Sequence, residues 1–482
     1  MYSKILDISK RRGIVYPSFE IYGGTSGFYD YGPIGKLIKN NIENLIRNHY
    51  IINENCYEIE CPTLSPEDIW IASGHIQNFA DLTTECTKCG EPYRADHLIE
   101  ADLKICCDGM SLTQIQALID ENDLRCPKCK GKLDKLYDYN LMFKTYVGSG
   151  KYKIEAFMRP ETAQGTYIAF RRLWEIGRRK LPLGVFQIGH SFRNEISPRQ
   201  GMIRLREFNQ CEVQVFVDPE NKTNENFEKN ENKISGIKAK ILVKDDSEVV
   251  MTLGEAHKKG IIKIQLIAYY LGISLKLFYE MGMDPGKLRL RQHKDDERAF
   301  YSSDTWDVEF ISDAFGRIEI LGISDRTDYD LTQHQHLSKQ DMSVNIEGKK
   351  FIPHVIEIAY GIDRPFYCVL ESALREDARG IYFSFPDAVA PYKASLFPLV
   401  KKDGIPGKAE EIHELLKKNK IYVTYDLSGS IGKRYARADE IGVPYCITVD
   451  HQTLEDGTVT IRERDSKEQE RYKIEELVEI LK

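Results

Sequence analysis

Two segments in the middle of the chain, residues 185–195 and 204–217, constrain the fold more than any other part of the sequence. We predict that they form paired strands, whose side chains alternate between the two faces. One shared face would then carry Arg193, Glu195, Arg204, Arg206, Phe208 and Glu212. Two cations suit a triphosphate, an aromatic ring suits a purine, and a carboxylate suits an exocyclic amine, so this surface matches ATP. The alternative is a salt-bridged hairpin, because Arg and Glu alternate on many solvated strands.

A downstream segment, residues 353–370, supports the first interpretation. Its sequence, PHVIEIAYGIDRPFYCVL, predicts a buried strand followed by a helix that opens at Gly361, with Arg364 in the first turn. Helix N-termini attract phosphate through free backbone amides and the helix dipole. Pro365 is compatible with a first turn, where a proline costs no intrahelical hydrogen bond. Taken alone, an arginine at such a position is more often simply solvated.

These segments resemble motifs 2 and 3 of class II aminoacyl-tRNA synthetases, and residues 32–62 resemble motif 1. Longer strings are similar to glycyl-tRNA synthetases of the archaeal, eukaryotic and homodimeric bacterial type. They are IYGGTSGFYDYGPIG from Ile21, ASGH from Ala72, RADHL from Arg94, RPETAQG from Arg159, FRNEISPRQGMIRLREF from Phe192 and DRTDYDL from Asp325. The resemblance implies an α/β (α+β) protein in which a class II catalytic domain with an antiparallel sheet and insertions precedes a mixed α/β anticodon-binding domain.

The same resemblance implies a glycine–tRNA ligase. Such an enzyme converts glycine and ATP to glycyl-adenylate and pyrophosphate, and then transfers the glycyl group to the 3′ end of tRNA(Gly). Neither step needs a side-chain nucleophile, so arginines and Mg²⁺ would orient the substrates and stabilise charge. Arg193, Arg364 and Glu319 are the implied catalytic residues, with Glu319 helping to hold magnesium. The implied ATP-binding residues are Arg193, Asn194, Glu195, Ile203, Arg204, Leu205, Arg206, Glu207, Phe208, Glu319, Ile320, Gly361 and Arg364.

Glycine has no side chain to grasp, so its pocket must exclude larger amino acids. Carboxylates around the ammonium would both bind glycine and limit the space, although each could instead pair with a neighbouring arginine. By resemblance, the glycine-binding residues are Arg94, Glu161, Glu212, Glu357 and Ala359. The family usually has Pro-Ser after the motif 3 glutamate, whereas this chain has Ile358 and Ala359. We therefore expect glycine specificity that is looser against alanine.

The landmarks divide the chain. We expect a catalytic domain over residues 1–386, interrupted by a zinc-binding insertion at 81–141 and a second insertion at 218–300. The second insertion opens with the polar segment 220–233, which is typical of a mobile loop. By resemblance it lies near the tRNA acceptor end, and a solvated lobe is the alternative.

Residues 387–482 alternate between strand and helix patterns, which predicts a mixed α/β domain. It resembles the class IIa anticodon-binding domain, and we expect a basic helix face of Lys433, Arg434 and Arg437 that contacts RNA phosphate. A generic solvated face is the alternative.

Four of the 11 cysteines form two CxxC pairs, Cys86 with Cys89 and Cys126 with Cys129. Two such pairs suit a tetrahedral, structural Zn²⁺ site, because each tight turn supplies two thiolates. Redox chemistry is the weaker interpretation, since neither pair follows a thioredoxin-like pattern. Cys106 and Cys107 are alternative ligands, although buried packing fits them better.

The net charge of −7 is not that of a general nucleic-acid-binding protein, so tRNA would have to meet local basic patches. No apolar run approaches the roughly 20 residues of a membrane span. We expect a cytoplasmic protein without membrane contact that forms a homodimer through motif 1. Two other functions stay open: a non-catalytic, synthetase-like nucleic-acid-binding protein, and a class IIa synthetase for another small amino acid.

Overall fold

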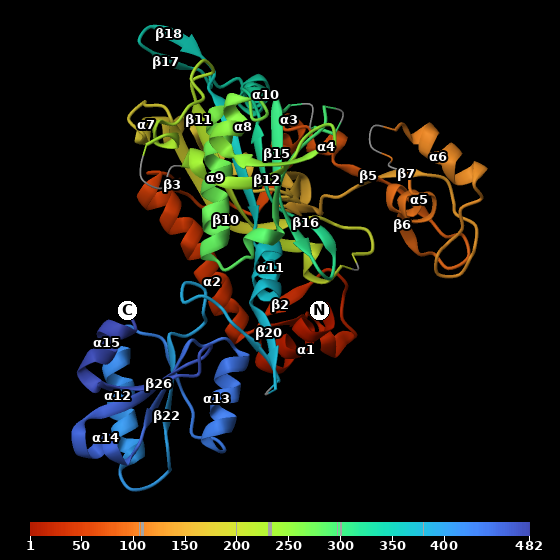
Figure 1. Cartoon of the computed structure of the whole chain (residues 1–482). Helices are drawn as coiled ribbons and strands as arrows, with labels where there is room; N and C mark the ends of the chain where they lie inside the picture. The colour runs from red at the N-terminus through yellow and green to blue at the C-terminus, as the bar shows by residue number, and fades with distance from the viewer. Residues whose placement is uncertain are drawn as a thin grey trace.

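A nine-stranded sheet forms the centre of the molecule (Figure 1). The computed structural model describes residues 1–482 except 106, 108–109, 199, 230–233, 296, 299–300 and 379. The strand order is β13 (Glu248–Thr252), β12 (Lys238–Leu242), β14 (Leu288–Gln292), β15 (Asp304–Ser312), β16 (Gly316–Asp325), β19 (His354–Gly361), β11 (Glu207–Val217), β10 (Leu183–Phe192) and β3 (Tyr57–Glu58). Most neighbouring pairs are antiparallel, as predicted for the catalytic sheet.

The pairing of β10 with β11 carries the predicted alternation. Ser191 lies opposite Phe208 and Gln187 lies opposite Glu212, so Phe208 and Glu212 share one face. The strands are shorter than predicted, however, since β10 ends at Phe192 and β11 begins at Glu207. Residues 193–206 form the connection, in which Gly201 adopts a φ of 58° that breaks the extended geometry. The arginines of this region are therefore presented by a loop.

Helices cover one face of the sheet and leave much of the other open. α2 (Pro33–Asn48), α9 (Gln265–Glu280) and α11 (Asp363–Ala373) share one hydrophobic core with the sheet. α9 is buried along almost its whole length, because its sequence is apolar on nearly every side. α7 (Ala163–Ile176) packs on the opposite face at one end of β10 and β11. The uncovered part of that face contains the site described below.

The segment 218–300 is part of the central sheet. It contributes β12, β13 and β14, and its helix α9 belongs to the main core. Leu288 and Leu290 point into that core, while Arg289 between them faces the open side. β14 pairs with β15 in an antiparallel arrangement. The alternative of a separately solvated lobe therefore does not describe this segment. Residues 230–233 of its polar start lie outside the described residues.

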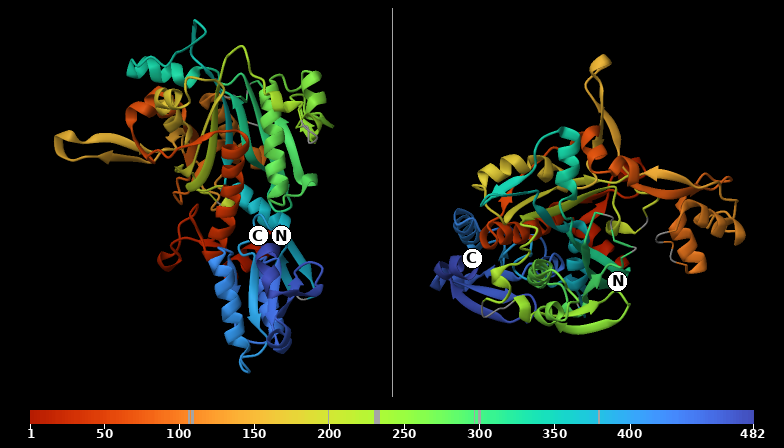
Figure 2. Two further views of the ribbon diagram at one scale, coloured as in Figure 1. Left: turned by 90° about the vertical axis from the view of Figure 1, so that its left-hand side faces the viewer. Right: turned by 90° about the horizontal axis from the view of Figure 1, so that it is seen from above.

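A second body, residues 81–141, stands away from the sheet (Figures 1 and 2). It contains the small sheet of β6 (Pro92–Arg94), β5 (Ala80–Glu85) and β7 (Tyr137–Asn140), with α5 (Ala95–Leu103) and α6 (Leu112–Glu121). These elements enclose a hydrophobic core of their own. We call this body the cysteine module, because it contains both CxxC pairs.

The C-terminal region is a mixed α/β domain with a separate core. Its five strands run in the order β23 (Val423–Tyr425), β22 (Ala394–Pro398), β24 (Tyr445–Val449), β25 (Thr458–Glu463) and β26 (Gln469–Lys473), with helices α12 (Ile405–Lys418), α13 (Ile431–Glu440) and α14 (His451–Asp456). This agrees with the predicted mixed α/β domain, in which β26 and α14 are short elements of five and six residues.

The predicted basic face of α13 is wrong in two of its three residues. Arg434 is buried and donates to the backbone carbonyls of Pro398 and Leu399. Arg437 pairs with Asp426 at 2.5 Å. Only Lys433 is exposed, so this face does not present three free cations.

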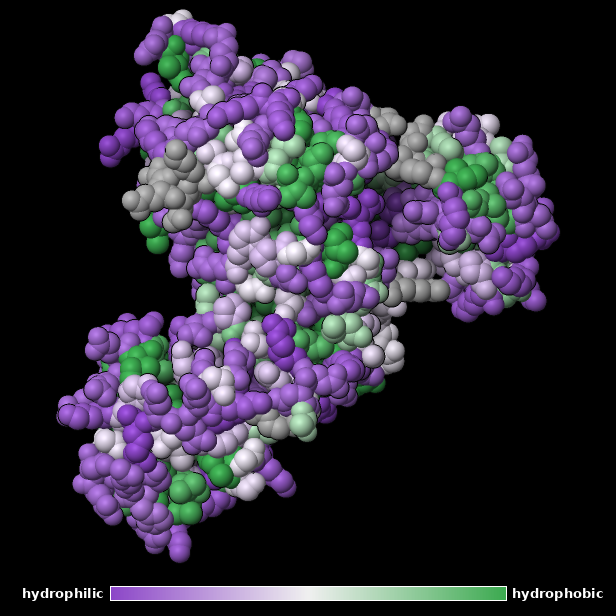
Figure 3. Space-filling view, in the orientation of Figure 1, coloured by the Kyte–Doolittle hydropathy of each residue, from purple (hydrophilic) through white to green (hydrophobic). Residues whose placement is uncertain are grey.

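Among the described residues, none of the helices combines the length and the apolar character that a membrane span requires. The surface seen in Figure 3 is mostly hydrophilic, including the hollow between the sheet and the cysteine module.

Candidate active site

A cavity of about 310 Å³ opens on the uncovered face of β11, β16 and β19. Fourteen of the predicted site residues line it: Glu161, Arg193, Glu195, Ile203, Arg204, Leu205, Phe208, Glu212, Glu319, Ile320, Glu357, Ala359, Gly361 and Arg364. The two-residue period explains the arrangement, because Phe208 and Glu212 of β11 and Glu357, Ala359 and Gly361 of β19 project from the same side. Residues far apart in sequence thus share one cavity.

One end of the cavity is aromatic and cationic. The guanidinium carbon of Arg193 lies 5.3 Å from the ring centre of Phe208 and 5.4 Å from that of Phe79. Arg193 Nε donates to the carbonyl oxygen of Pro160 at 3.2 Å, which fixes the side chain above the ring. An aromatic floor beside a fixed cation can hold a purine and a phosphate.

Arg364 lies in the first turn of α11, as predicted. Its Nε donates to the carbonyl of Ile203 at 3.1 Å, and its Nη1 lies 3.3 Å from Glu319 Oε2. Burial opposes ionisation of Glu319, but Arg364 and then Arg193 outweigh it and lower the pKa of this carboxyl. Glu319 is thus held as an anion between two arginines, which suits a cation-binding role in the presence of phosphate.

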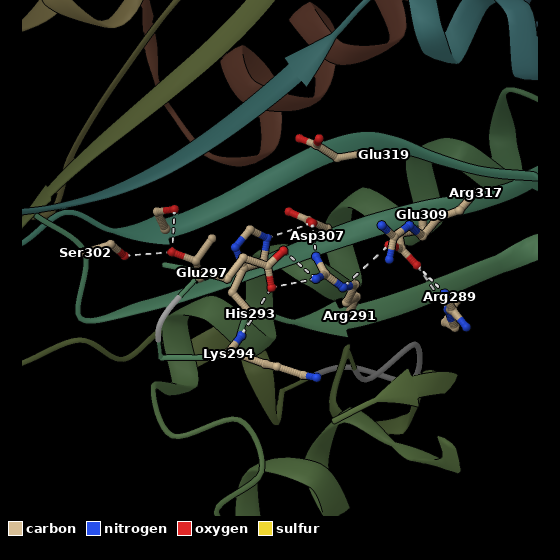
Figure 4. Close-up of polar contacts among 12 residues, drawn as sticks. Arg289, Arg291, His293, Lys294, Glu297, Ser302, Asp307, Glu309, Arg317 and Glu319 are labelled. Carbon is tan, nitrogen blue, oxygen red and sulfur yellow. Dashed lines mark hydrogen bonds and ion pairs between the residues drawn. The ribbon is translucent and has the colours of Figure 1, made fainter. Parts of the chain in front are cut away.

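The neighbouring acids on the same sheet face are occupied by other cations (Figure 4). Asp307 lies 2.7 Å from His293 and 3.3 Å from Arg291, whereas Glu309 is bound by Arg289 at 2.7 Å. Burial and then the charge of Glu319 raise the pKa of Asp307 to about 6. Glu319 is the acid of this group that faces Arg364 across the cavity wall.

Glu195 presents an acceptor to the cavity. Its Oε2 is buried without a hydrogen-bond partner among the described residues, and Arg204 Nε lies 3.8 Å away. A buried carboxylate oxygen in this state favours a ligand that donates a hydrogen bond.

Three glutamates meet at the other end of the cavity. Thr162 donates to Glu212 at 2.6 Å, Gln164 donates to Glu161 at 2.8 Å, and Gln214 donates to Glu357 at 3.0 Å. Burial, followed by the charges of Glu357 and Glu161, raises the pKa of Glu212 to about 8. A small ligand with a positive charge would relieve this repulsion.

The other two glutamates titrate differently. Burial opposes ionisation of Glu161, yet the charge of the nearby His75, supported by Arg326, lowers its pKa. Burial raises the pKa of Glu357, partly offset by Arg326. The pocket therefore combines an anion at Glu161 with a Glu212 carboxyl that is largely neutral at pH 7.

Sequence reasoning missed Arg326 and Gln210, which also line the cavity. Arg326 is buried and contacts Asp330 and Glu357, and it lies 4.2 Å from the ring centre of Tyr301. Gln210 occupies the position between Phe208 and Glu212 on β11, so the alternation used for those two residues could have identified it. Arg326 belongs to the DRTDYDL string from Asp325, which could have marked it as a candidate.

Four predicted residues lie outside the cavity lining. Arg206 donates to the carbonyls of Glu195 and Ser26, and Glu207 faces the opposite side of β11 near His190. Asn194 contacts the cysteine module, and Arg94 is part of it. Arg94 forms ion pairs with Asp81 and Asp96 at 2.9 and 2.5 Å, and Asn194 donates to Tyr139 at 2.5 Å.

The four predicted metal ligands converge in the cysteine module. The sulfur atoms of Cys86, Cys89, Cys126 and Cys129 all lie within 4.8 Å of one another. The Cys86–Cys129 and Cys89–Cys126 separations are 3.4 and 3.7 Å. Tetrahedral zinc with Zn–S bonds of about 2.3 Å requires S···S separations of about 3.8 Å, so the cluster fits this ion. Cys107 is buried and lies outside this group, and Cys106 lies outside the described residues.

Two family models match the chain. Residues 147–373 match the tRNA synthetase class II core domain (G, H, P, S and T), and residues 393–482 match the anticodon binding domain.

The chain is similar over its full length to curated glycine–tRNA ligases. It is 44% identical to the enzyme of Methanocaldococcus jannaschii, with 100% of this chain and 98% of the relative covered. It is 42% identical to the enzymes of Methanococcus maripaludis and Pyrococcus horikoshii, again with 100% of this chain and at least 98% of each relative covered. A solved structure, Giardia lamblia prolyl-tRNA synthetase in complex with prolyl-adenylate, matches with a TM-score of 0.61 at 16% identity, covering 99% of this chain and 74% of that one. That likeness concerns the fold alone.

Proposed function

Because the chain belongs to the glycine–tRNA ligase family of class II aminoacyl-tRNA synthetases, we propose that it activates glycine with ATP and transfers the glycyl group to tRNA(Gly). The observation that carries this proposal is the cavity itself. Arg193, Phe208 and Arg364 lie at one end, and three glutamates meet at the other. The distribution of charge matches a nucleotide joined to a small amino acid that is recognised by its ammonium.

Each end has a distinct role in this proposal. Phe208 stacks on adenine, Glu195 accepts the adenine amine, and Arg193 holds the α-phosphate and the glycine carboxylate. Arg364 binds the γ-phosphate, with Glu319 beside it helping to hold Mg²⁺. Catalysis then consists of orientation and stabilisation of phosphate charge, for which no protein nucleophile is required.

At the glycine end, Glu161, Glu212 and Glu357 surround the ammonium. Glu212 and Glu357 are buried and the Glu161 side chain is only 12% exposed, so a larger substrate side chain would have to displace packed protein. Such exclusion discriminates more strongly than the gain from one methylene. Arg326 keeps Glu357 in place through the 3.0 Å contact.

We propose that the four-cysteine cluster holds a structural Zn²⁺, consistent with its sulfur separations.

We also propose a homodimer formed around motif 1. Ile52 and Tyr57, which are 70% and 40% exposed near the edge strand β3, leave apolar surface available there. Sedimentation analysis tests this, and a monomer at micromolar concentration would exclude it. A cytoplasmic location agrees with the structure, which records no disulfide bond between the described cysteines.

The decisive experiment is ATP–pyrophosphate exchange with a panel of amino acids. Glycine should support exchange, whereas serine, threonine, proline and alanine should support little. Arg364→Ala should lower the glycine-dependent kcat/KM by at least about 100-fold, the loss typical of one group that stabilises transition-state charge. Arg317→Ala is the matched control, because Arg317 lies on the same strand as Glu319 but outside the cavity lining, 3.5 Å from Glu309. Exchange that is faster with another amino acid than with glycine, or no exchange with any of them, would refute the proposal.

A further inference from the structure

The connection between β10 and β11, residues 193–206, is held by the cysteine module. We call this connection the nucleotide loop, because Arg193, Glu195 and Arg204 line the cavity from it. Residues of the module hydrogen-bond to this loop. Among the described residues, the module itself contributes none to the cavity lining, so its effect on the site acts through the nucleotide loop.

Hydrogen bonds join the two bodies at four points. Asn194 donates through its backbone N–H to the carbonyl of Leu141 at 2.7 Å and through its side chain to Tyr139 at 2.5 Å. Ser197 Oγ donates to the carbonyl of Pro92 at 3.2 Å, and Arg204 Nη1 lies 3.4 Å from His97 Nε2. The contacts therefore reach both ends and the middle of the nucleotide loop, and they come from β6, from α5 and from the β7 region.

A short segment of the module, residues 92–97, connects these contacts to the cysteines. Tyr93, which directly follows Pro92, has its hydroxyl 3.3 Å from Cys126 Sγ. Arg94 is fixed within the module by Asp81 and Asp96, and α5 begins at the next residue. His97 thus stands in the first turn of a helix whose start is tied to the thiol cluster.

The surroundings of Arg204 show how the contact between the module and the nucleotide loop affects the cavity. The Arg204 guanidinium is partly buried beside two other arginines, Arg94 and Arg364, which repel it. Glu195 of the loop and Asp81 of the module attract it, and its Nη1 lies 3.4 Å from His97 Nε2 of the module. Without the module contact, repulsion favours movement of Arg204 away from the cavity.

We propose that the cysteine module positions the nucleotide loop, with His97 as the positioning residue for Arg204, so that ATP affinity depends on residues 92–97. The identity of the nucleotide rests on the proposed function. Glycine binding at the opposite end of the cavity depends little on this device. The three glutamates belong to the central sheet and to the segment before α7, and Arg193, which holds the glycine carboxylate, is fixed by the carbonyl of Pro160 outside the module.

The test compares His97→Ala, Ser197→Ala and the double variant with Glu121→Ala, a control on the exposed side of α6. The KM for ATP in pyrophosphate exchange should rise about 3- to 10-fold in each single variant, as expected for the loss of one hydrogen bond, and further in the double variant. The KM for glycine should stay within about twofold. His97→Gln, which keeps an acceptor, should restore most of the ATP affinity.

Two readouts separate positioning from general damage. Amide hydrogen exchange of residues 193–206 should speed up in the double variant while the core strands β11 and β19 stay protected. Where the double variant melts early, Tyr139→Phe, which removes a single hydroxyl, replaces it. Unchanged ATP affinity with unchanged loop exchange, or an equal rise in both KM values, would overturn the proposal.

If the wild-type protein shows no glycine-dependent exchange, calorimetric titration with a non-hydrolysable ATP analogue measures the nucleotide affinity directly. Binding that weakens in the variants, in a wild-type protein that shows no glycine-dependent exchange, would refute the proposed function and leave this inference standing.

Discussion

The guanidinium of Arg326 donates to Glu357 Oε2 at 3.0 Å. The same guanidinium binds the carboxylate of Asp330 at 2.7 and 2.9 Å, and all three residues are buried. Removing one member of such a group costs more than the interaction itself, because the remaining charges stay uncompensated away from water. The position and charge of Glu357 at the glycine end therefore depend on Arg326.

Arg326→Met should destabilise the protein by about 3–5 kcal/mol, since it leaves two carboxylates of the buried group unpaired. Chemical denaturation measures this loss. Arg317→Met serves as the control, because Arg317 is 57% exposed in its pair with Glu309 and should cost less than about 1 kcal/mol. Equal effects of the two substitutions would contradict the assigned role of Arg326.

The raised pKa of Glu212, about 8, predicts a pH dependence of glycine binding. Below this value the carboxyl is mostly neutral, and it ionises as the pH rises through 8. An ammonium prefers the anion, so the KM for glycine should fall by about tenfold or more between about pH 6.5 and pH 8.5. Steady-state exchange across this range measures it.

Thr162→Val provides the control for that profile. The Thr162 hydroxyl lowers the pKa of Glu212, although burial and the charges of Glu357 and Glu161 dominate. Its removal should therefore move the profile to higher pH. A flat profile in the wild-type protein would exclude Glu212 as the titrating group.

The same shift has a consequence for stability. Because the carboxyl of Glu212 binds its proton more tightly in the folded protein, its contribution to stability is complete below about pH 4.5 and is lost as the pH rises through 8. Glu212→Gln should thus raise the melting temperature at pH 8.5 by a few degrees while abolishing glycine-dependent exchange. A variant that is no more stable than wild type at this pH would argue against burial as the main cause of the shift.

Some features of this molecule can be predicted from its sequence and others cannot. The pairing of β10 with β11 and the strand-to-helix turn at Arg364 were predictable, because period-two alternation and first-turn chemistry are local properties. The family was identified from long strings in the right order, and the full-length relatives confirm it.

Other features depend on contacts that are distant in sequence. β12 and β14 join the central sheet through non-local pairing, for which residues 218–300 carry no local signal. The helix wheel groups Arg434 with Lys433 and Arg437 but does not reveal that backbone carbonyls of another strand bind it. Arg326 is missed for the same reason, since a buried arginine and a solvated one look alike in sequence.

Gln210 lies between the two ends of the cavity. Its Nε2 donates to Glu212 at 3.2 Å, whereas its Oε1 is buried without a hydrogen-bond partner among the described residues. We predict that Gln210→Met raises the KM for glycine about tenfold or more and leaves the KM for ATP within about twofold, because an ammonium would lose an uncharged acceptor. Gln210→Glu, which keeps an acceptor, is the comparison. A rise in both KM values would indicate a structural role instead.

Ala359 faces Glu212 on one neighbouring strand and Gly322 on the other. A serine hydroxyl at this position would occupy space that the methyl group of an alanine substrate requires. Ala359→Ser should therefore lower alanine-dependent exchange relative to glycine by about 3- to 10-fold. An unchanged ratio would show that this position does not limit the pocket.

Metal removal should separate the cysteine module from the rest of the fold. The module has a small core of its own, so it depends on its cross-link, whereas the core of the central sheet does not include the cysteine cluster. Elemental analysis should find one zinc per chain, and chelation should produce a low-temperature transition that involves only the module. The main transition should stay in place, and added zinc should restore the original profile. Cys126→Ser should reproduce the chelated state, because Cys126 also contacts Tyr93. A single, unshifted transition after complete zinc removal would show that the thiol cluster does not stabilise the module.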